Sequence, residues 1–129
     1  MKNKIPVICA IIERNDKVLV VQRSPTMKLP LKWEFPGGKL EKNESEEACL
    51  KREIREELNI EILPQKRLTP SVFSYPDVFI ELIPYIAKQT GGELKLSEHA
   101  RFEYLNKSDL LHLDWAQADV PIVKEYLAL

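Results

Sequence analysis

The sequence predicts a mixed α/β fold, in which a single domain over residues 1–129 places a curved mixed sheet between helices. Three observations support this prediction. Runs rich in β-forming residues lie on both sides of a central helical pattern, and a second helical pattern closes the chain. The length of 129 residues and the hydrophobic content of 44% suit one globular domain that needs no disulfide or structural metal. We find no internal repeat, low-complexity segment or linker.

The N-terminal part predicts a β-hairpin. Residues 5–12 and 17–22 are β-rich runs, and the turn-forming residues Asn15 and Asp16 lie between them. Residues 25–36 contain three prolines and are expected to form a loop that carries Trp33 and other apolar side chains.

The central helix is expected over residues 44–58. Leu50, Ile54 and Leu58 recur at i, i+4 and i+8, which predicts one buried face. Pro64 cannot continue the helix, and we expect it to open the next β region.

The C-terminal half predicts further strands. Residues 68–75 and 78–87 are β-rich, although Pro84 implies a bulge or a local break in the second run. Gly91-Gly92 is expected to form a turn, and residues 102–105 a short strand.

A closing helix is expected over residues 118–128, with Pro121 in its first turn. Its buried stripe would comprise four residues, Ile122, Val123, Tyr126 and Leu127.

Charge and cysteine content limit the partners. A net charge of −1 gives no electrostatic reason to expect a stable nucleic-acid partner or an anionic membrane surface. Cys9 and Cys49 lie among apolar residues and are expected to pack as small hydrophobic side chains in a reducing compartment. The apolar run at residues 5–12 is too short to span a membrane, so a cytoplasmic location is expected.

Three carboxylates dominate the central helix. Glu53, Glu56 and Glu57 fall at i, i+3 and i+4, which puts them side by side on one helical face. Neighbouring like charges destabilise a helix, whereas Mg²⁺ and Mn²⁺ prefer such oxygen ligands. The spacing therefore indicates a site for Mg²⁺, with Mn²⁺ as an alternative.

A plainer interpretation is a solvated helix face, on which Lys51, Arg52 and Arg55 pair with the glutamates. What favours the metal site is the sequence upstream. A glycine pair, Gly37-Gly38, and then Glu44 precede the helix at set distances.

These residues resemble the box of the Nudix hydrolase family, Gly-x5-Glu-x7-Arg-Glu-apolar-x-Glu-Glu-x-Gly-apolar. The matching positions are Gly38, Glu44, Arg52, Glu53, Ile54, Glu56, Glu57 and Ile60. Asn59 departs from the box, since the family has a glycine there to end the helix. Asn is the commonest substitute for glycine in a left-handed conformation, so we expect the change to be tolerated.

The resemblance implies an α/β/α sandwich and the hydrolysis of a diphosphate linkage with divalent metal. It implies that the metal ligands are the Gly37 carbonyl with Glu53, Glu56 and Glu57, and that Glu53 is a candidate general base. Backbone groups at Gly38 would approach the phosphates without interference from a Cβ atom. Arg52 and Glu44 would form an internal pair that holds the loop and the helix together.

Glu98 is a second candidate base and a further metal ligand by resemblance to MutT-like members of the family. On its own, this glutamate would be an ordinary surface residue in the loop after Gly91-Gly92, and only the resemblance makes the functional role an equal alternative. The neighbouring His99 is expected to be structural or solvent-facing, because a site for a hard metal needs no imidazole.

The resemblance also implies a substrate pocket. Arg23 would contact phosphate or sugar, Phe35 and Tyr75 would stack on the base, and Asp119 would read the base edge. Core packing is the alternative for both aromatic side chains. Asp119 has an alternative role as the cap of the closing helix. Relatives that favour oxidised guanine nucleotides can carry Asn at this last position. The Asp in this chain therefore weakens the expectation that it prefers oxidised guanine.

The predicted function is Mg²⁺-dependent hydrolysis of nucleoside triphosphates to a nucleoside monophosphate and pyrophosphate. Oxidised dGTP, in nucleotide-pool sanitation, and CTP or dCTP are the leading substrates. The alternatives are a hydrolase of nucleotide sugars or dinucleoside polyphosphates, or a Nudix module that binds a nucleotide without cleaving it. The oligomeric state is expected to be a monomer or a homodimer.

Overall fold

In the computed structural model, which describes residues 3–129, a mixed eight-stranded sheet lies at the centre. The strand order is β3-β2-β1-β7-β5, with β4 paired to β1, β6 to β7 and β8 to β2. The strands are β1 (Asn3–Arg14), β2 (Lys17–Gln22), β3 (Trp33–Glu34), β4 (Gly37–Lys39), β5 (Ile60–Arg67), β6 (Ser71–Ser74), β7 (Val78–Gly92) and β8 (Arg101–Leu105). The helices are α1 (Glu46–Leu58) and α2 (Val120–Leu127), and residues Lys107–His112 and Gln117–Asp119 form 3-10 turns.

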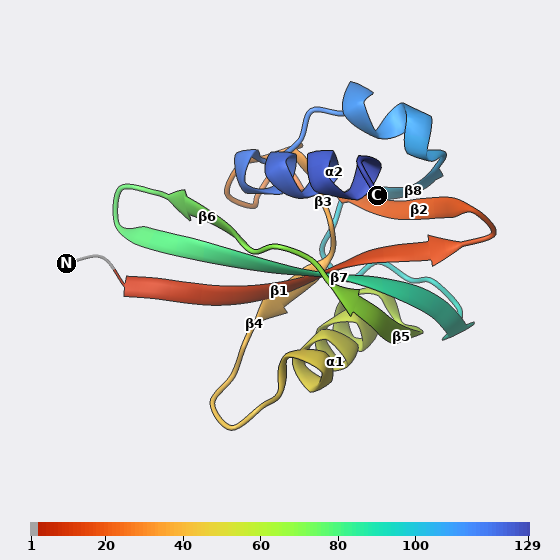
Figure 1. Ribbon diagram of the computed structural model, residues 1–129, viewed down its shortest axis with the longest axis horizontal. Helices are drawn as coiled ribbons and strands as arrows, with labels where there is room; N and C mark the ends of the chain where they lie inside the picture. The colour runs from red at the N-terminus through yellow and green to blue at the C-terminus, as the bar shows by residue number, and fades with distance from the viewer. Residues whose placement is uncertain (1–2) are drawn as a thin grey trace.

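β1 is the strand around which the layers are built. It runs parallel to β7 and antiparallel to β2 and β4. Its side chains alternate between the two faces, so Ile8 and Ile12 join the cluster under α1, while Cys9 and Ile11 join the cluster under α2. The helices thus cover opposite faces of the sheet (Figure 1). The predicted α/β class with helices on both sides of a mixed sheet is confirmed.

α1 begins two residues later than predicted. Ser45 is the N-cap, and its hydroxyl accepts a hydrogen bond from the Ala48 N–H at 3.1 Å. The predicted apolar stripe is confirmed, because Leu50, Ile54 and Leu58 are fully buried.

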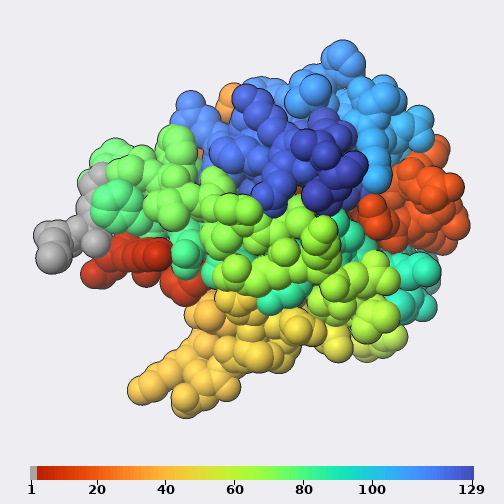
Figure 2. Space-filling model, in the orientation of Figure 1, coloured from red at the N-terminus to blue at the C-terminus, as the bar shows by residue number. Residues whose placement is uncertain are grey.

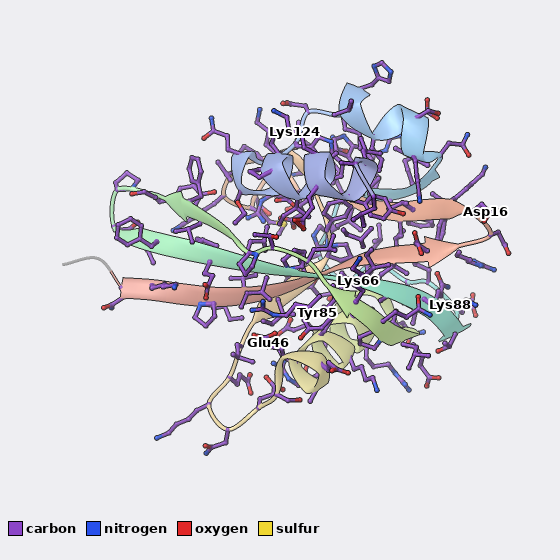
Figure 3. The ribbon with its side chains drawn as sticks, in the orientation of Figure 1. Asp16, Glu46, Lys66, Tyr85, Lys88 and Lys124 are labelled. Atoms are coloured by element: carbon purple, nitrogen blue, oxygen red, sulfur yellow. The ribbon has the colours of Figure 1, made fainter. Side chains whose placement is uncertain are left out.

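Asn59 ends α1 in the left-handed conformation expected for it, with φ 59° and ψ 27°. Its N–H donates to the Arg55 carbonyl, and its side-chain amide donates to the Glu93 carbonyl at 2.9 Å. At the other end of the helix, the Tyr85 hydroxyl of β7 donates to Glu46 at 2.7 Å (Figure 3). Both ends of α1 are therefore tied to neighbouring segments.

Two strand predictions need correction. The first strand after α1, β5, starts directly after Asn59 and runs through Pro64, so the region predicted as residues 68–75 is reduced to β6. Gly91-Gly92 is not a turn. The two glycines end β7 and pair with Glu61 and Ile60 of β5.

Pro84 does not break β7, which runs unbroken past it. The interruption lies in its partners, because β6 pairs with β7 as far as Leu82 and β5 pairs from Tyr85 onward. A proline has no N–H for a strand partner, and here it falls where one partner strand has ended and the next has not begun.

The remaining differences are local. Trp33 and Glu34, predicted as loop, form β3 against β2. The closing helix α2 starts at Val120, two residues later than predicted, because residues 117–119 form a 3-10 turn; Pro121 lies in its first turn, as predicted. The loop between β4 and α1 projects from the body of the molecule (Figure 2). Within residues 3–129, no helix is both long and apolar enough to cross a membrane.

Candidate active site

The glutamates of α1 lie beside β4, where the glycine pair lets the two elements approach closely. A Cβ atom at Gly38 would overlap the carboxyl group of Glu53, and one at Gly37 would overlap the carbonyl of Ile8. Glycine is therefore required at position 37, where a Cβ would meet backbone, whereas at position 38 a Cβ would displace the Glu53 side chain. The structure thus brings the predicted glycine pair of β4 next to Glu53, one of the three glutamates of α1 that were predicted as metal ligands.

Arg52 holds this arrangement in place. Its guanidinium donates to both Glu44 oxygens, at 2.7 and 3.0 Å, so the pair predicted between these residues is present. The hydrogen bond from Arg52 lowers the pKa of Glu44 to about 2. The same guanidinium donates to Glu53 at 2.8 Å and to Glu56 at 3.4 Å. One arginine thus ties the loop before α1 to two of the three helix carboxylates.

Glu57 is the exception among the three. Its Oε2 atom is buried and has no hydrogen-bond partner among residues 3–129. Burial raises the pKa of Glu57 to about 8, with further contributions from four nearby carboxylates: Glu53, Glu34, Glu98 and Glu56. The side chain therefore lies in a crowded negative site.

Glu98 reaches this site from an exposed loop position. The loop is held against the end of α1, because the Lys95 and Ser97 N–H groups donate to the carbonyls of Leu58 and Glu57 at 2.9 and 3.0 Å. Its proximity to Glu57 is thus fixed by backbone hydrogen bonds. Its role as ligand or base remains a prediction.

The donor set fits a hard divalent cation. Several carboxylates lie near the buried Glu57 oxygen that has no hydrogen-bond partner in residues 3–129, and a hard divalent cation would relieve the repulsion among them. In the described part of the chain, however, no three His, Cys, Asp or Glu side chains are already arranged as ligands of one ion. Arg52 occupies one oxygen of Glu53 and one of Glu56. The second oxygen of each carboxylate could bind a cation while the arginine stays in place.

A second polar cluster adjoins the first. Arg23 donates to Glu34 Oε1 at 2.9 Å, and His99 Nε2 lies 2.8 Å from Glu34 Oε2. The side chain of His99 is only 3% exposed, so it is not solvent-facing. Glu34 and His99 were not predicted as site residues. Their positions next to Phe35 and Glu98 were the only signals in the sequence.

Asp119 is buried at the start of α2, but its side chain does not cap the helix. Its Oδ2 atom instead accepts a hydrogen bond from the Phe35 N–H at 2.9 Å. The capping interpretation is therefore wrong. Burial raises the pKa of Asp119 well above its usual range, and Glu34 adds to the effect, while the Phe35 N–H and Arg23 oppose it.

The two predicted aromatic residues differ. The ring of Phe35 is buried, and its centroid lies 4.8 Å from that of the Trp115 ring. This fits the alternative that the Phe35 side chain packs in the core. Tyr75 is half-buried. Burial raises the pKa of Tyr75, and Asp119 contributes to the rise while Arg23 lowers it. Arg23, Tyr75 and Asp119 thus lie near enough to affect one another electrostatically, and their role as a pocket remains a prediction.

A hollow of about 740 Å³ lies elsewhere on the molecule. It is lined by Glu13, Arg14, Asn15, Asp16, Gln65, Lys88, Gln89 and Lys107. None of the predicted site residues takes part in it, so it supplies no argument about the carboxylate site.

Comparison with known proteins finds relatives along nearly the whole chain. The model of the NUDIX domain family matches residues 2–126. The CTP pyrophosphohydrolase of Escherichia coli K12 is 34% identical over 125 residues, which cover 97% of this chain and 93% of that protein. The 8-oxo-dGTP diphosphatase of Proteus vulgaris is 33% identical over 94 residues, or 72% of this chain and 84% of that protein. The solution structure of MutT from methicillin-resistant Staphylococcus aureus, of the Nudix hydrolase family, has a TM-score of 0.81 and 40% identity, covering 99% and 98% of the two chains.

Proposed function

This chain belongs to the Nudix hydrolase family, and from that premise we propose that it hydrolyses nucleoside triphosphates with Mg²⁺. Water adds to an inner phosphorus, the bond to the bridging oxygen breaks, and a nucleoside monophosphate and pyrophosphate leave. The chain would act as one such catalytic domain, with Mn²⁺ as an alternative to Mg²⁺.

The observation that carries the proposal is the environment of Glu57. A buried carboxylate oxygen, with no hydrogen-bond partner among the residues that the structure describes, lies near the carboxylates of Glu53, Glu56, Glu98 and Glu34. Like charges that crowd a partly buried site raise the free energy of the metal-free protein. A divalent cation removes that cost, and a triphosphate supplies further oxygen ligands to the same ion.

The chain's own residues would divide the work. Glu53, Glu56, Glu57 and Glu98, with the carbonyl of Gly37, would hold the metal. Bound Mg²⁺ would neutralise charge on the phosphate oxygens and assist ionisation of the attacking water. Either Glu53 or Glu98 would accept the proton of that water.

Glu44 and Arg52 keep the loop and the helix in register, as their hydrogen bonds at 2.7 and 3.0 Å support. Positioning of this kind matters because phosphoryl substitution depends mainly on orientation and charge stabilisation.

The base pocket would lie beside this metal site. Arg23, Tyr75 and Asp119 meet there, and Asp119 is the candidate for reading the base edge. One of its oxygens already accepts the Phe35 N–H, so a base would meet the other. Oxidised dGTP and CTP or dCTP are the candidate substrates, in line with the names of the Proteus vulgaris and Escherichia coli relatives.

The test is a substrate panel with Mg²⁺ in which pyrophosphate and phosphate are measured separately. We expect pyrophosphate from oxidised dGTP or from a cytidine triphosphate. Turnover confined to nucleotide sugars or dinucleoside polyphosphates would contradict the triphosphate proposal, while binding without turnover of any compound would favour a non-catalytic module.

Matched variants of α1 locate the chemistry. Glu53→Gln and Glu57→Gln keep the side-chain shape but remove a ligand charge, so each should lower turnover by orders of magnitude. Glu47→Gln, on an exposed position of the same helix, is the control and should leave turnover unchanged. Near-normal turnover of either glutamine variant at limiting Mg²⁺ would remove that residue from the ligand set.

A further inference from the structure

His99 lies between the two polar clusters of the site. Its Nε2 atom is 2.8 Å from Glu34 Oε2, and its Nδ1 atom is 4.0 Å from Glu57 Oε2. Its side chain is 3% exposed, so water cannot compete freely for either ring nitrogen. The imidazole therefore lies between Glu34, which is paired with Arg23, and Glu57 of α1.

The contact between His99 Nδ1 and Glu57 Oε2 is too long to be a hydrogen bond. His99 Nδ1 and Glu57 Oε2 are both buried, and both lack a hydrogen-bond partner among the described residues. Buried polar side-chain atoms are nearly always paired, so two such atoms facing each other call for an explanation. Their separation of 4.0 Å exceeds a normal N–H···O distance by about 1 Å. A small rotation of the Glu57 side chain would close it.

The backbone around His99 leaves little freedom for any other adjustment. The Ser97 N–H donates to the carbonyl of Glu57 itself at 3.0 Å, and the Ala100 N–H donates to Gln22 at 2.9 Å. The histidine is thus fixed on both sides, and one of its anchors is the residue that its ring faces. The loop sets the imidazole at a constant distance from the end of α1.

We propose that His99 is a positioning residue, whose Nδ1–H donates a hydrogen bond to Glu57 Oε2 and leaves the other carboxylate oxygen turned toward the metal. A proton held between His99 Nε2 and Glu34 Oε2, which lie 2.8 Å apart, would keep the ring in the required orientation. This inference rests on the proposed function, because it takes Glu57 as a metal ligand. His99 itself is not a ligand, since Mg²⁺ prefers oxygen. Groups that orient a metal ligand in this way typically change metal affinity by about 10–100-fold when removed.

Two amide substitutions separate the two ring nitrogens. The side-chain amide of Asn reaches about as far as Nδ1 of histidine, and that of Gln about as far as Nε2. Mn²⁺ affinity is measured without substrate by electron paramagnetic resonance, and thermal melting checks that each variant is folded. We expect His99→Gln, which replaces only the contact with Glu34, to weaken Mn²⁺ binding by about 10–100-fold. We expect His99→Asn, which replaces the contact with Glu57, to bind Mn²⁺ nearly as tightly as the wild type. Equal or reversed effects of the two variants would overturn the positioning role.

The wild-type protein offers an independent measurement that does not depend on how variants fold. The chain has two histidines, and the other, His112, is exposed and serves as the internal control. Its nitrogen resonances are assigned with His112→Asn. On titration with Mg²⁺, we expect the His99 Nδ1 resonance to shift more than its Nε2 resonance, with His112 unchanged.

The outcomes separate the two proposals. A wild-type protein that binds Mg²⁺ while the His99 resonances stay constant would overturn the inference about His99 alone. A wild-type protein that binds neither Mg²⁺ nor Mn²⁺ would overturn the proposed function, and the inference with it.

Discussion

Replacing Glu57 by glutamine should stabilise the metal-free protein while removing a ligand of the proposed metal site. In the folded protein, burial and neighbouring carboxylates raise the pKa of Glu57 from 4.5 to about 8. The folded state therefore holds a proton on Glu57 that the unfolded chain has already lost at neutral pH. That difference links the free energy of unfolding to pH.

The sign and size of the effect follow from this pKa. The contribution of the protonated Glu57 is fully present below pH 4.5 and is lost as the pH rises toward 8. The loss approaches roughly 1 kcal/mol per pH unit within that window. The side chain remains 27% exposed, which moderates the effect. We expect the free energy of unfolding of Glu57→Gln to exceed that of the wild type by on the order of 2–4 kcal/mol at pH 8. At pH 4.5 the two free energies should be almost equal.

The assay is thermal and urea unfolding in EDTA between pH 4.5 and 8.5. For a chain of this size, the gain at pH 8 corresponds to a rise in Tm of roughly 10 °C. Glu47→Gln, from an exposed position on the same helix, should show no such pH dependence. Saturating Mg²⁺ should then raise the Tm of the wild type but not that of Glu57→Gln. Parallel stability curves for wild type and Glu57→Gln across this range would refute the assigned environment of Glu57.

Three further outcomes are expected. Asp119→Ala leaves the Phe35 N–H without its partner and should lower stability by about 1–3 kcal/mol, measured by urea unfolding; Asp119→Asn keeps an acceptor oxygen and should lose less. If Asp119 also reads the base, both changes should alter the ranking of kcat/KM among oxidised dGTP, dGTP, CTP and dCTP, and an unchanged ranking would remove that role. Asn59→Gly should leave turnover unchanged and alter stability by less than about 1 kcal/mol, because relief of the left-handed strain offsets a lost side-chain hydrogen bond. Glu44→Gln should lower the Tm at pH 7, and since the folded pKa of about 2 lies below the usual 4.5, the difference should vanish as the pH falls through about 2.

The sequence predicted the features that depend on local spacing. The face of α1 with Leu50, Ile54 and Leu58 is set by helical periodicity, and the left-handed Asn59 by what a helix end requires. The pairing of Arg52 with Glu44 spans only eight residues and was inferred from the box. Each of these features is fixed by geometry within one turn or one loop.

The features missed by the sequence depend on which distant segments the sheet brings together. The contact of Glu34 with His99 spans 65 residues, and that of Asp119 with Phe35 spans 84. Asp before a helix with proline in its first turn has the composition of an N-cap, and only the folded protein reveals that the side chain is used elsewhere. The glycine pair at the end of β7 was similarly taken for a turn because its partner strand could not be identified from the sequence.

Glu34 gives these distant contacts a common consequence. It raises the pKa of both Glu57 on α1 and Asp119 before α2, while it is paired with Arg23 and His99. The proposed metal site and the proposed base pocket therefore share one electrostatic environment. A cation bound beside Glu57 would favour the ionised form of nearby carboxylates, including that of Asp119. If both proposed sites are correct, metal binding would thus change how readily Asp119 accepts the N–H groups of a base, and the two sites would be coupled through charge.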